Sequence, residues 1–353
     1  MFKNTYDNLM NKLTEGKKTV LLTHLKCEND KKGSIIKKEL MTRYDIRSSY
    51  EDELNMKINN ALVTGKTNIY KTKDNSMILI EPYFPKPRLI IFGGGHIAKP
   101  LVNFGTKVGF STTVVDDRPS FANLGRFPNA NDVICDSFEN SFNQFNIRDS
   151  DFIIIVTRGH RHDEVCLRNT LKYSPAYIGM IGSKRRVKGI KDKLLNDGYT
   201  DDQLDQVNAP IGLDIGAVTP EEIAISIIGE VISYRRINKT SDKTIKKVNW
   251  PEFEPDIINN LYKEDDVPKA LVTIISSKGS VPRKAGAKMI VWLDGRTLGS
   301  IGGGCSEASI ITNARDIILE KGYAIEEVDM TADMAEKEGM VCGGKMKVLI
   351  EAL

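Results

Sequence analysis

The 353-residue sequence predicts an α/β protein in which a domain with a parallel β-sheet is flanked by two smaller β-rich modules. Two patterns carry this prediction. In the middle of the chain, short apolar runs alternate with helical patterns, which is typical of a parallel sheet covered by helices. At the two ends, a similar succession of β-type segments occurs twice. The predicted divisions of the chain are 1–86, 87–237, a linker at 238–268, and 269–353.

The sequences of the N-terminal and C-terminal parts indicate two copies of one module. Three segments recur in the same order, namely 20–24, 32–37 and 78–82 in the N-terminal copy and 271–275, 278–283 and 348–351 in the C-terminal copy. The N-terminal copy lacks the two glycine-rich cysteine segments of the C-terminal copy. We therefore expect a reduced copy that supports or dimerises and an intact copy that carries the chemistry. Because a reduced copy serves chiefly to pack against its counterpart, within or across chains, we also expect a homodimer.

The middle domain opens with a glycine-rich turn. The apolar run 88–92 leads directly into the pattern G-x-G-x-x-A at residues 93–98, and a helical pattern follows. A second predicted strand, 111–115, ends at Asp116, about 20 residues after the glycines, where such domains bind a ribose hydroxyl. Strand, glycine turn, helix, strand and acid together predict a Rossmann-like domain that binds a dinucleotide-type ligand such as NAD(P).

Further strands are predicted at 133–135, 152–156 and 176–181, and parallel strands place ligands at their C-terminal edge. The helix after Ser183 begins with three basic residues, which the helix dipole disfavours unless an anion is bound there. A phosphate would explain them, and a solvated basic face is the alternative. The candidate ligand-binding residues at this edge are Gly93, Gly95, His96, Asp116, Arg118, Thr157, His160, Gly182, Ser183 and Lys184. The histidines of this edge supply at most a partial ligand shell, so no metal site is predicted.

The C-terminal copy contains two cysteines among glycines, Cys305 within 299–307 and Cys342 within 339–344. Glycine lets backbone N–H groups approach a bound anion, and three successive glycines are unfavourable inside a strand or helix. The two thiols are therefore candidates for a ligand site. Ordinary buried cysteines beside glycine turns are the alternative.

Composition narrows the class of protein. A formal net charge of +3, from 50 basic and 47 acidic residues, does not favour nucleic acid as a partner. The sequence shows no signal peptide and no apolar run of membrane length, so no membrane association is expected. Five scattered cysteines, an odd number, predict reduced thiols in the cytoplasm and not a disulfide framework.

Several motifs are shared with one protein family and together span most of residues 87–353. They are 116–119, 126–128, 177–183, 210–217, 279–283, 286–289, 302–307 and 339–344. On these motifs the sequence resembles the XdhC/CoxI family of xanthine dehydrogenase accessory proteins. The resemblance implies that the protein binds the molybdenum cofactor (molybdopterin), assists its sulfuration or protection, and delivers it to a molybdenum hydroxylase such as xanthine dehydrogenase. A cysteine desulfurase is a further implied partner.

The domain order departs from the usual family order, in which the cysteine module precedes the Rossmann domain. The recipient hydroxylase and the path of the cofactor therefore stay open.

The resemblance assigns roles to the C-terminal copy. Thiolates of Cys305 and Cys342 would ligate or shield the molybdenum, and Glu307 would tune the neighbouring thiol. The groups expected to meet the oxygens or phosphate of the cofactor are Arg283, Lys288 and the backbone of Gly303, Gly304 and Gly343. These roles describe a maturation chaperone more than a turnover enzyme.

Two alternatives remain. The first is an NAD(P)-dependent oxidoreductase built on the middle domain, where no Tyr-x-x-x-Lys or comparable hydride-transfer pattern is visible. The second is a nucleotide- or redox-sensing regulatory protein that uses the cysteine pair as a thiol switch.

Overall fold

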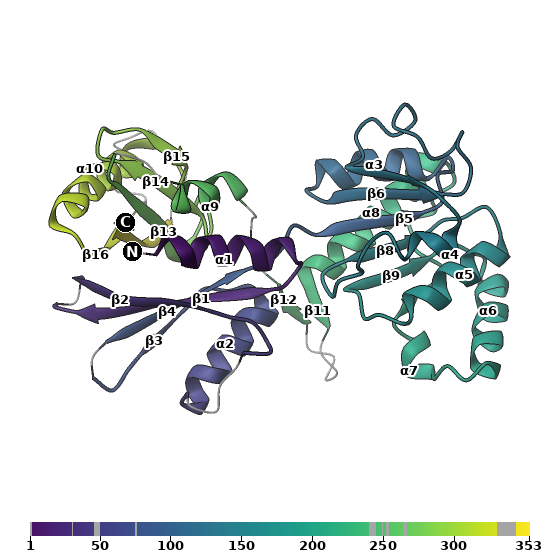
Figure 1. The fold of residues 1–353 in the computed structure, drawn as a ribbon, viewed down its shortest axis with the longest axis horizontal. Coiled ribbons are helices and arrows are strands. Elements are labelled where there is room, and N and C mark those ends of the chain that lie inside the picture. Colours follow the sequence, from purple (N-terminus) through teal and green to yellow (C-terminus); the bar gives the residue numbers. More distant parts are fainter. Residues whose placement is uncertain are drawn as a thin grey trace. The chain divides into compact units, whose positions relative to one another are not determined.

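A computed structural model describes residues 2–29, 31–45, 50–74, 76–239, 245–248, 250–251, 254–263, 267–329 and 344–353. The chain forms two compact units (Figure 1). One unit is Pro85–Lys247, and the other combines Met1–Phe84 with Val248–Leu353. Within the described part of the chain, no helix combines the length and apolar character that a membrane crossing requires.

The unit Pro85–Lys247 contains a six-stranded parallel sheet in the order β10-β9-β8-β5-β6-β7. Its strands are β5 (Arg88–Phe92), β6 (Ser111–Asp116), β7 (Asp132–Cys135), β8 (Phe152–Ile155), β9 (Tyr177–Met180) and β10 (Val207–Asn208). Numbered along the chain, this is the order 3-2-1-4-5-6 of a doubly wound Rossmann fold. The predicted Rossmann-like domain is confirmed.

Helices cover both faces of this sheet, as crossover connections between parallel strands require. They are α3 (Ala98–Lys107), α4 (Phe138–Ser141), α5 (His160–Thr170), α6 (Lys184–Asn196), α7 (Asp201–Leu204) and α8 (Pro220–Arg236). On one face, Phe92 and Ile155 pack in a buried cluster with Leu167 of α5 and Leu194 of α6. Helices α3 and α8 contact each other, and α3 also contacts β6. Because both faces are covered, β8 is buried along its whole length.

The other unit contains a nine-stranded antiparallel sheet in the order β15-β14-β13-β17-β16-β2-β1-β4-β3. The strands of the N-terminal copy are β1 (Thr19–Cys27), β2 (Lys32–Met41), β3 (Asn68–Lys71) and β4 (Met77–Tyr83). Those of the C-terminal copy are β13 (Lys269–Gly279), β14 (Lys288–Trp292), β15 (Thr297–Gly299), β16 (Tyr323–Asp329) and β17 (Gly344–Ala352). The copies join edge to edge where β16 pairs with β2.

Strand order and register show that these two parts are structural repeats. The order β2-β1-β4-β3 matches β14-β13-β17-β16. Leu21 is paired with Glu81 in the first copy, as Leu271 is with Glu351 in the second. Likewise Thr23 pairs with Lys38, as Thr273 does with Lys288. The residues of β1 from Val20 to His24 thus correspond to those of β13 from Ala270 to Ile274.

Each copy covers its outer face with a helix of its own. Val20, Leu22 and Ile80 pack against α2 (Asp52–Thr64) in the N-terminal copy. In the C-terminal copy, Val272 and Ile274 pack against α10 (Gly304–Glu320). This arrangement follows from strand alternation, since residues two apart share one face.

The inner faces of the two copies pack on each other. Leu25 and Leu79 form a buried cluster with Ile275 and Leu349 of the other copy, and Leu79 and Leu349 are register equivalents. A second cluster joins Leu21 and Leu271 with residues of α1 (Lys3–Thr14) and α9 (Pro255–Tyr262). The core of this unit is therefore an intrachain interface between repeats.

Two buried ion pairs cross this interface in a reciprocal pattern. Lys38 Nζ lies 2.7 Å from Glu351 Oε1, and both side chains are 0% exposed. Lys288, the register equivalent of Lys38, pairs with Glu81, the equivalent of Glu351. Burial opposes the charge on Lys38, but Glu351, Tyr6 and Glu81 together outweigh it and raise the pKa of Lys38 above its ordinary value. Each copy therefore supplies one lysine and one glutamate to the other.

The segment 238–268 differs from the expected linker. At its start, β11 (Ile237–Lys239) pairs with β12 (Ile245–Lys247), and α9 follows. The side chains of Ile257, Ile258 and Leu261 on α9 are buried in the core of the unit. The polar composition of the segment concealed one short amphipathic helix, which the apolar positions 257, 258 and 261 mark at helical spacing.

Candidate functional site

The glycine loop of the C-terminal copy runs from the end of β15 into α10. The carboxylate of Glu307, in the first turn of α10, folds back over this loop. Its Oε2 accepts hydrogen bonds from Ser300 Oγ (2.7 Å), Ile301 N (3.0 Å), Gly302 N (3.2 Å) and Gly303 N (2.9 Å). The N-cap residue Gly303 has φ of 76°, a backbone conformation that glycine adopts without strain. The loop is thus a fixed structure held by one carboxylate.

The charge of Glu307 is stabilised where it lies. Burial would raise its pKa, but the hydrogen bonds from Ser300 and the loop N–H groups lower it below the ordinary value. The N-terminus of α10 favours the same negative charge. The N–H group of Gly303, expected to meet an anion of the cofactor, donates to Glu307. Glu307 is thereby a positioning residue for the loop that precedes Cys305.

Cys305 is the second residue of α10, directly after Gly304. The backbone of this turn is helical, and the side chains of residues 304–306 lie outside the described ones. Cys342 and Gly343 also lie outside the described residues. The predicted pairing of the two thiols at one site therefore stays a prediction.

The two basic residues expected to meet a phosphate have protein partners. Lys288 is 6% exposed, and its Nζ binds Glu81 and also Thr273 Oγ1 at 3.0 Å. Arg283 Nη2 lies 2.5 Å from Glu254 Oε1. Lys288 thus lies inside the unit, at the interface of the copies, and not at a ligand surface. The signal that could have shown this was its counterpart Lys38 in the repeat, which has the same kind of partner.

At the C-terminal edge of the parallel sheet, the structure brings the ends of β5 and β8 together. Val156 N donates to Phe92 O (2.8 Å), so Gly93 and Thr157 leave the sheet side by side. Thr157 Oγ1 donates to Asp163 Oδ1 (2.5 Å), and Asp163 also pairs with Arg186. This is the point where strand order reverses, which is where α/β sheets bind ligands.

The acid after β6 is already bound by its own chain. Asp116 is buried and accepts hydrogen bonds from Gly94 N (2.8 Å), Arg118 Nε (2.8 Å) and Arg118 Nη2 (2.9 Å). Burial would raise the pKa of Asp116, but the hydrogen bonds from Arg118 and Gly94 lower it. Arg118 therefore neutralises the group that was expected to accept a ribose hydroxyl.

Arg126, which sequence reasoning did not single out as a site residue, binds the carbonyl oxygens of the glycine turn. Its Nε donates to Gly94 O (2.9 Å) and its Nη2 to Gly95 O (3.3 Å). The neighbouring Asp117 forms an ion pair with Arg158. This arginine belongs to the shared motif 126–128, but the sequence assigned it no role because the loop that carries it has no regular spacing.

Several of the predicted ligand-binding residues at the C-terminal edge of the parallel sheet are open to solvent. His96, His160 and Lys184 are exposed, as is Ser183. Ser183 caps α6, as predicted, by accepting a hydrogen bond from Arg186 N (3.3 Å). Gly182 lies half-buried directly before this cap. The exposed Lys184 and Arg185 thus place basic groups in the first turn of α6.

Comparison with known proteins gives matches in both units. The family model described as the XdhC Rossmann domain matches residues 89–231, and that of the XdhC and CoxI family matches residues 263–329. Together these segments make up more than half of the chain.

Two curated relatives align over 159 residues, 45% of this chain. A Bacillus subtilis (strain 168) protein described as a probable xanthine dehydrogenase subunit is 34% identical over 46% of its own length. The uncharacterized protein YqeB of Escherichia coli (strain K12) is 28% identical over 29% of its length. The chain thus spans less than half of either relative.

A crystal structure described as a xanthine dehydrogenase from Bacillus halodurans is 29% identical, with a TM-score of 0.48. The match covers 67% of this chain and 65% of that one.

Proposed function

Because the chain belongs to the XdhC/CoxI family, we propose that it is an accessory protein that binds the molybdenum cofactor and passes it to a molybdenum hydroxylase such as xanthine dehydrogenase. One observation carries the proposal. Of two copies with the same strand order and register, the C-terminal copy has the glycine loop, held by Glu307, that leads Cys305 into α10. The N-terminal copy has no corresponding glycine loop in its sequence.

The position of Cys305 suits a metal-binding thiolate. The dipole of a helix N-terminus favours the thiolate form of a cysteine in the first turn, while the nearby carboxylate of Glu307 opposes it. When bound, the cofactor would supply a molybdenum centre that prefers sulfur ligands. Glu307 would act indirectly, by holding the loop in place so that the backbone at Cys305 keeps one position.

The other residues that were expected to bind the cofactor differ in whether they are available to do so. Lys288 does not fit, because it is buried and already paired with Glu81. The loop N–H groups fit only if Glu307 moves away, since it accepts hydrogen bonds from three of them. The proposed role therefore rests on the thiol. Protection or sulfuration of the cofactor, with a cysteine desulfurase as sulfur donor, belongs to the same proposal.

The oxidoreductase alternative has less support. It requires NAD(P) at the glycine turn of the parallel sheet, with Asp116 on the ribose. Both carboxylate oxygens of Asp116 already accept hydrogen bonds from Arg118.

The proposal is tested on the full chain, purified from a host that makes the molybdenum cofactor. Released pterin, molybdenum and nucleotide are measured for the wild type, for Cys305→Ala and for Cys135→Ala. Cys135 is an exposed thiol of the other unit and serves as the matched control. We expect Cys305→Ala to lose pterin and molybdenum by about tenfold, equivalent to about 1.4 kcal/mol, while its thermal unfolding stays that of the wild type.

Two results would overturn the proposal. The first is equal retention of pterin in Cys305→Ala and Cys135→Ala. The second is a wild-type protein that carries no pterin and turns over NAD(P).

A further inference from the structure

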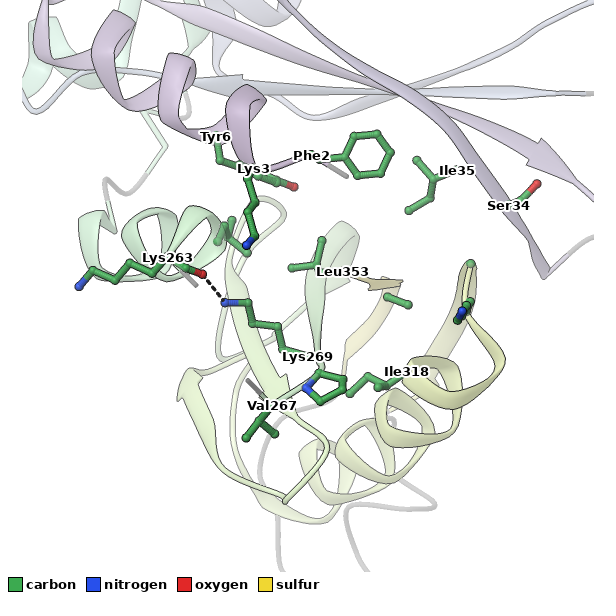
Figure 2. A pocket seen from close by; sticks show the side chains of 15 residues that line it. Phe2, Lys3, Tyr6, Ser34, Ile35, Lys263, Val267, Lys269, Ile318 and Leu353 are labelled. Carbon is green, nitrogen blue, oxygen red and sulfur yellow. Dashed lines mark hydrogen bonds between the residues drawn. The ribbon is translucent and has the colours of Figure 1, made fainter. Parts of the chain in front are cut away.

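A pocket of about 530 Å³ opens between the two copies in the unit that combines Met1–Phe84 with Val248–Leu353 (Figure 2). Its walls come from α1, β2, α9, the start of β13, the end of α10 and the end of β17. The residues that line it include Phe2, Lys3, Ile35, Lys269, Ile318 and Leu353. The volume falls in the range of small-molecule sites.

The pocket exists because side chains fill the corresponding space in the N-terminal copy but leave it open in the C-terminal copy. Ala352 lines it, and the register equivalent of Ala352 in the N-terminal copy is Pro82. The space beside Pro82 is taken up by Phe84 and by Ile257 and Ile258 of α9, and only about 30 Å³ stays open there. At Ala352, α1 covers the space without filling it. The space at Ala352 therefore stays open in one copy, whereas the corresponding space in the other copy is almost filled.

The walls divide into an apolar side and a cationic side. Figure 2 shows Phe2, Ile35, Ile318 and Leu353 around the space, with the side chain of Lys3 entering it from α1, while the ammonium of Lys269 is turned to the carbonyl oxygen of Lys263. Lys269 is 8% exposed, and its Nζ binds the carbonyl oxygen of Asn260. Among the described residues that line the pocket, four are lysines and none is an aspartate or glutamate.

The backbone adds an independent sign. Lys321, at the rim after α10, has φ of 66° and ψ of 164°, a region that side-chain-bearing residues rarely adopt. Strain of this kind persists where the surrounding structure enforces it, and it is concentrated at ligand sites.

We propose that this pocket binds a small amphipathic anion. An apolar body of roughly ten heavy atoms would lie against Phe2, Ile35 and Ile318, and one carboxylate or phosphate would face Lys3. The ligand would contact both copies and so stabilise their packing on each other.

This site is separate from the proposed cofactor site. Ile318 and Lys321 lie at the C-terminal end of α10, whereas Cys305 lies at its N-terminal end. A helix of 17 residues is about 25 Å long. The pocket and the proposed cofactor site therefore lie at opposite ends of α10. Loss of one function would leave the other measurable.

The test uses the full chain and decanoate, below its micellar concentration, as the probe. Decyltrimethylammonium has the same apolar chain and the opposite charge, and it is the ligand control. Calorimetric titration and thermal unfolding should show that decanoate binds and stabilises the protein, while decyltrimethylammonium binds at least about tenfold more weakly.

Two pairs of variants locate the site. Ile35→Trp should fill the pocket and weaken decanoate about tenfold. Ile36→Trp, on the next residue of β2, places the same bulk at an exposed position outside the pocket and should bind as the wild type does. Lys3→Glu should weaken decanoate and strengthen decyltrimethylammonium, whereas Lys12→Glu, on the same helix but outside the pocket, should do neither.

The proposal is overturned if decanoate does not bind at millimolar concentration. It is equally overturned if Ile35→Trp and Lys3→Glu bind decanoate as well as Ile36→Trp and Lys12→Glu do, because the probe would then lie elsewhere.

Discussion

The N-terminal and C-terminal copies share a fold but not a chemistry. Strand order, register and the buried lysine and glutamate are the same in both. The glycine loop held by Glu307, with Cys305 and Cys342, belongs to the C-terminal copy alone. What both copies keep is the set of residues that packs one copy on the other. What differs is the loop before the helix, which packing does not constrain.

The comparison also bears on the expected homodimer. We expected the reduced copy to pack against a counterpart within or across chains, and it packs against the copy in its own chain. An unpartnered copy is therefore no longer a reason for a second protomer. Light scattering at micromolar concentration decides between monomer and dimer.

The largest effect should come from breaking a buried ion pair between the copies. Glu351→Ala leaves the ammonium of Lys38 buried without its carboxylate, which typically costs about 3–5 kcal/mol of unfolding free energy. Glu81→Ala leaves Lys288 in the equivalent position and should cost about as much. Both tryptophans of the chain, Trp250 and Trp292, belong to this unit, so their fluorescence in urea reports its unfolding.

Two controls distinguish the loss of a buried ion pair from the general effect of removing a charge. The double variant Lys38→Met/Glu351→Leu replaces the pair by apolar groups and should recover most of the loss. Glu15→Ala removes a surface ion pair with Lys17 and should leave the urea midpoint almost unchanged. A loss below about 1 kcal/mol in Glu351→Ala would mean that the interface does not depend on the reciprocal pairs.

The second largest effect should come from the edge where β16 of one copy meets β2 of the other. Gly322 has φ of 93°, and a Cβ atom there would overlap the carbonyl oxygen of Gly33. Gly322→Ala therefore adds a clash to backbone strain and should cost about 2–3 kcal/mol in urea unfolding.

Gly295→Ala is the matched control for this variant. Gly295 has φ of 91° in the same unit, but nothing lies within 4 Å of a Cβ placed on it. It should show the strain without the clash. If the two variants are equally stable, the β16–β2 edge does not hold the copies together.

The parts that the sequence predicted are those with local or periodic signals. The glycine turn after β5 and the continuous apolar strands gave the Rossmann domain, because strands buried on both faces are apolar throughout. The short matches 20–24 and 271–275 indicated the repeat. Local spacing also marks Glu307, an acid in the first turn of a helix after a glycine loop.

The parts that the sequence did not predict depend on distant partners. Lys288 resembled a phosphate ligand because its partner Glu81 is 207 residues away. Lys38 and Glu351 are separated by 313 residues. The helix α9 was concealed in a polar segment, and Asp116 was assigned to a ribose because its binding by Arg118 and Gly94 has no spacing rule. Tertiary contacts of this kind override any local pattern.

The third prediction concerns the loop that distinguishes the copies. Glu307→Gln removes the charge that the loop N–H groups bind and should cost about 1–2 kcal/mol locally. Because the pKa of Glu307 is lowered in the folded state, its contribution is present at neutral pH and is lost as pH falls below the ordinary value of 4.5. Amide hydrogen exchange at Ile301 and Gly303 measures this directly.

For Glu307→Gln, local hydrogen exchange at the loop is compared with the unfolding of the whole unit, which Trp fluorescence in urea reports. Exchange at the loop should accelerate several-fold, while the unfolding midpoint of the unit changes little. Unchanged exchange at Ile301 and Gly303 would show that Glu307 does not hold the loop.

The smallest effect should come from making the outer face of the N-terminal copy resemble that of the C-terminal copy. His24 Nε2 lies 2.7 Å from Glu39 Oε1, and the register equivalents of these two residues are the apolar Ile274 and Met289. Burial lowers the pKa of His24 below 6.5 and outweighs the opposing effect of Glu39. The unfolded chain then binds more protons than the folded chain, so stability falls as pH drops through about 6.5. His24→Ile removes this dependence, and its urea midpoints at pH 7.5 and 5.5 should differ less than those of the wild type. Parallel pH dependence in the two proteins would show that His24 stays as easily protonated in the fold as in the unfolded chain.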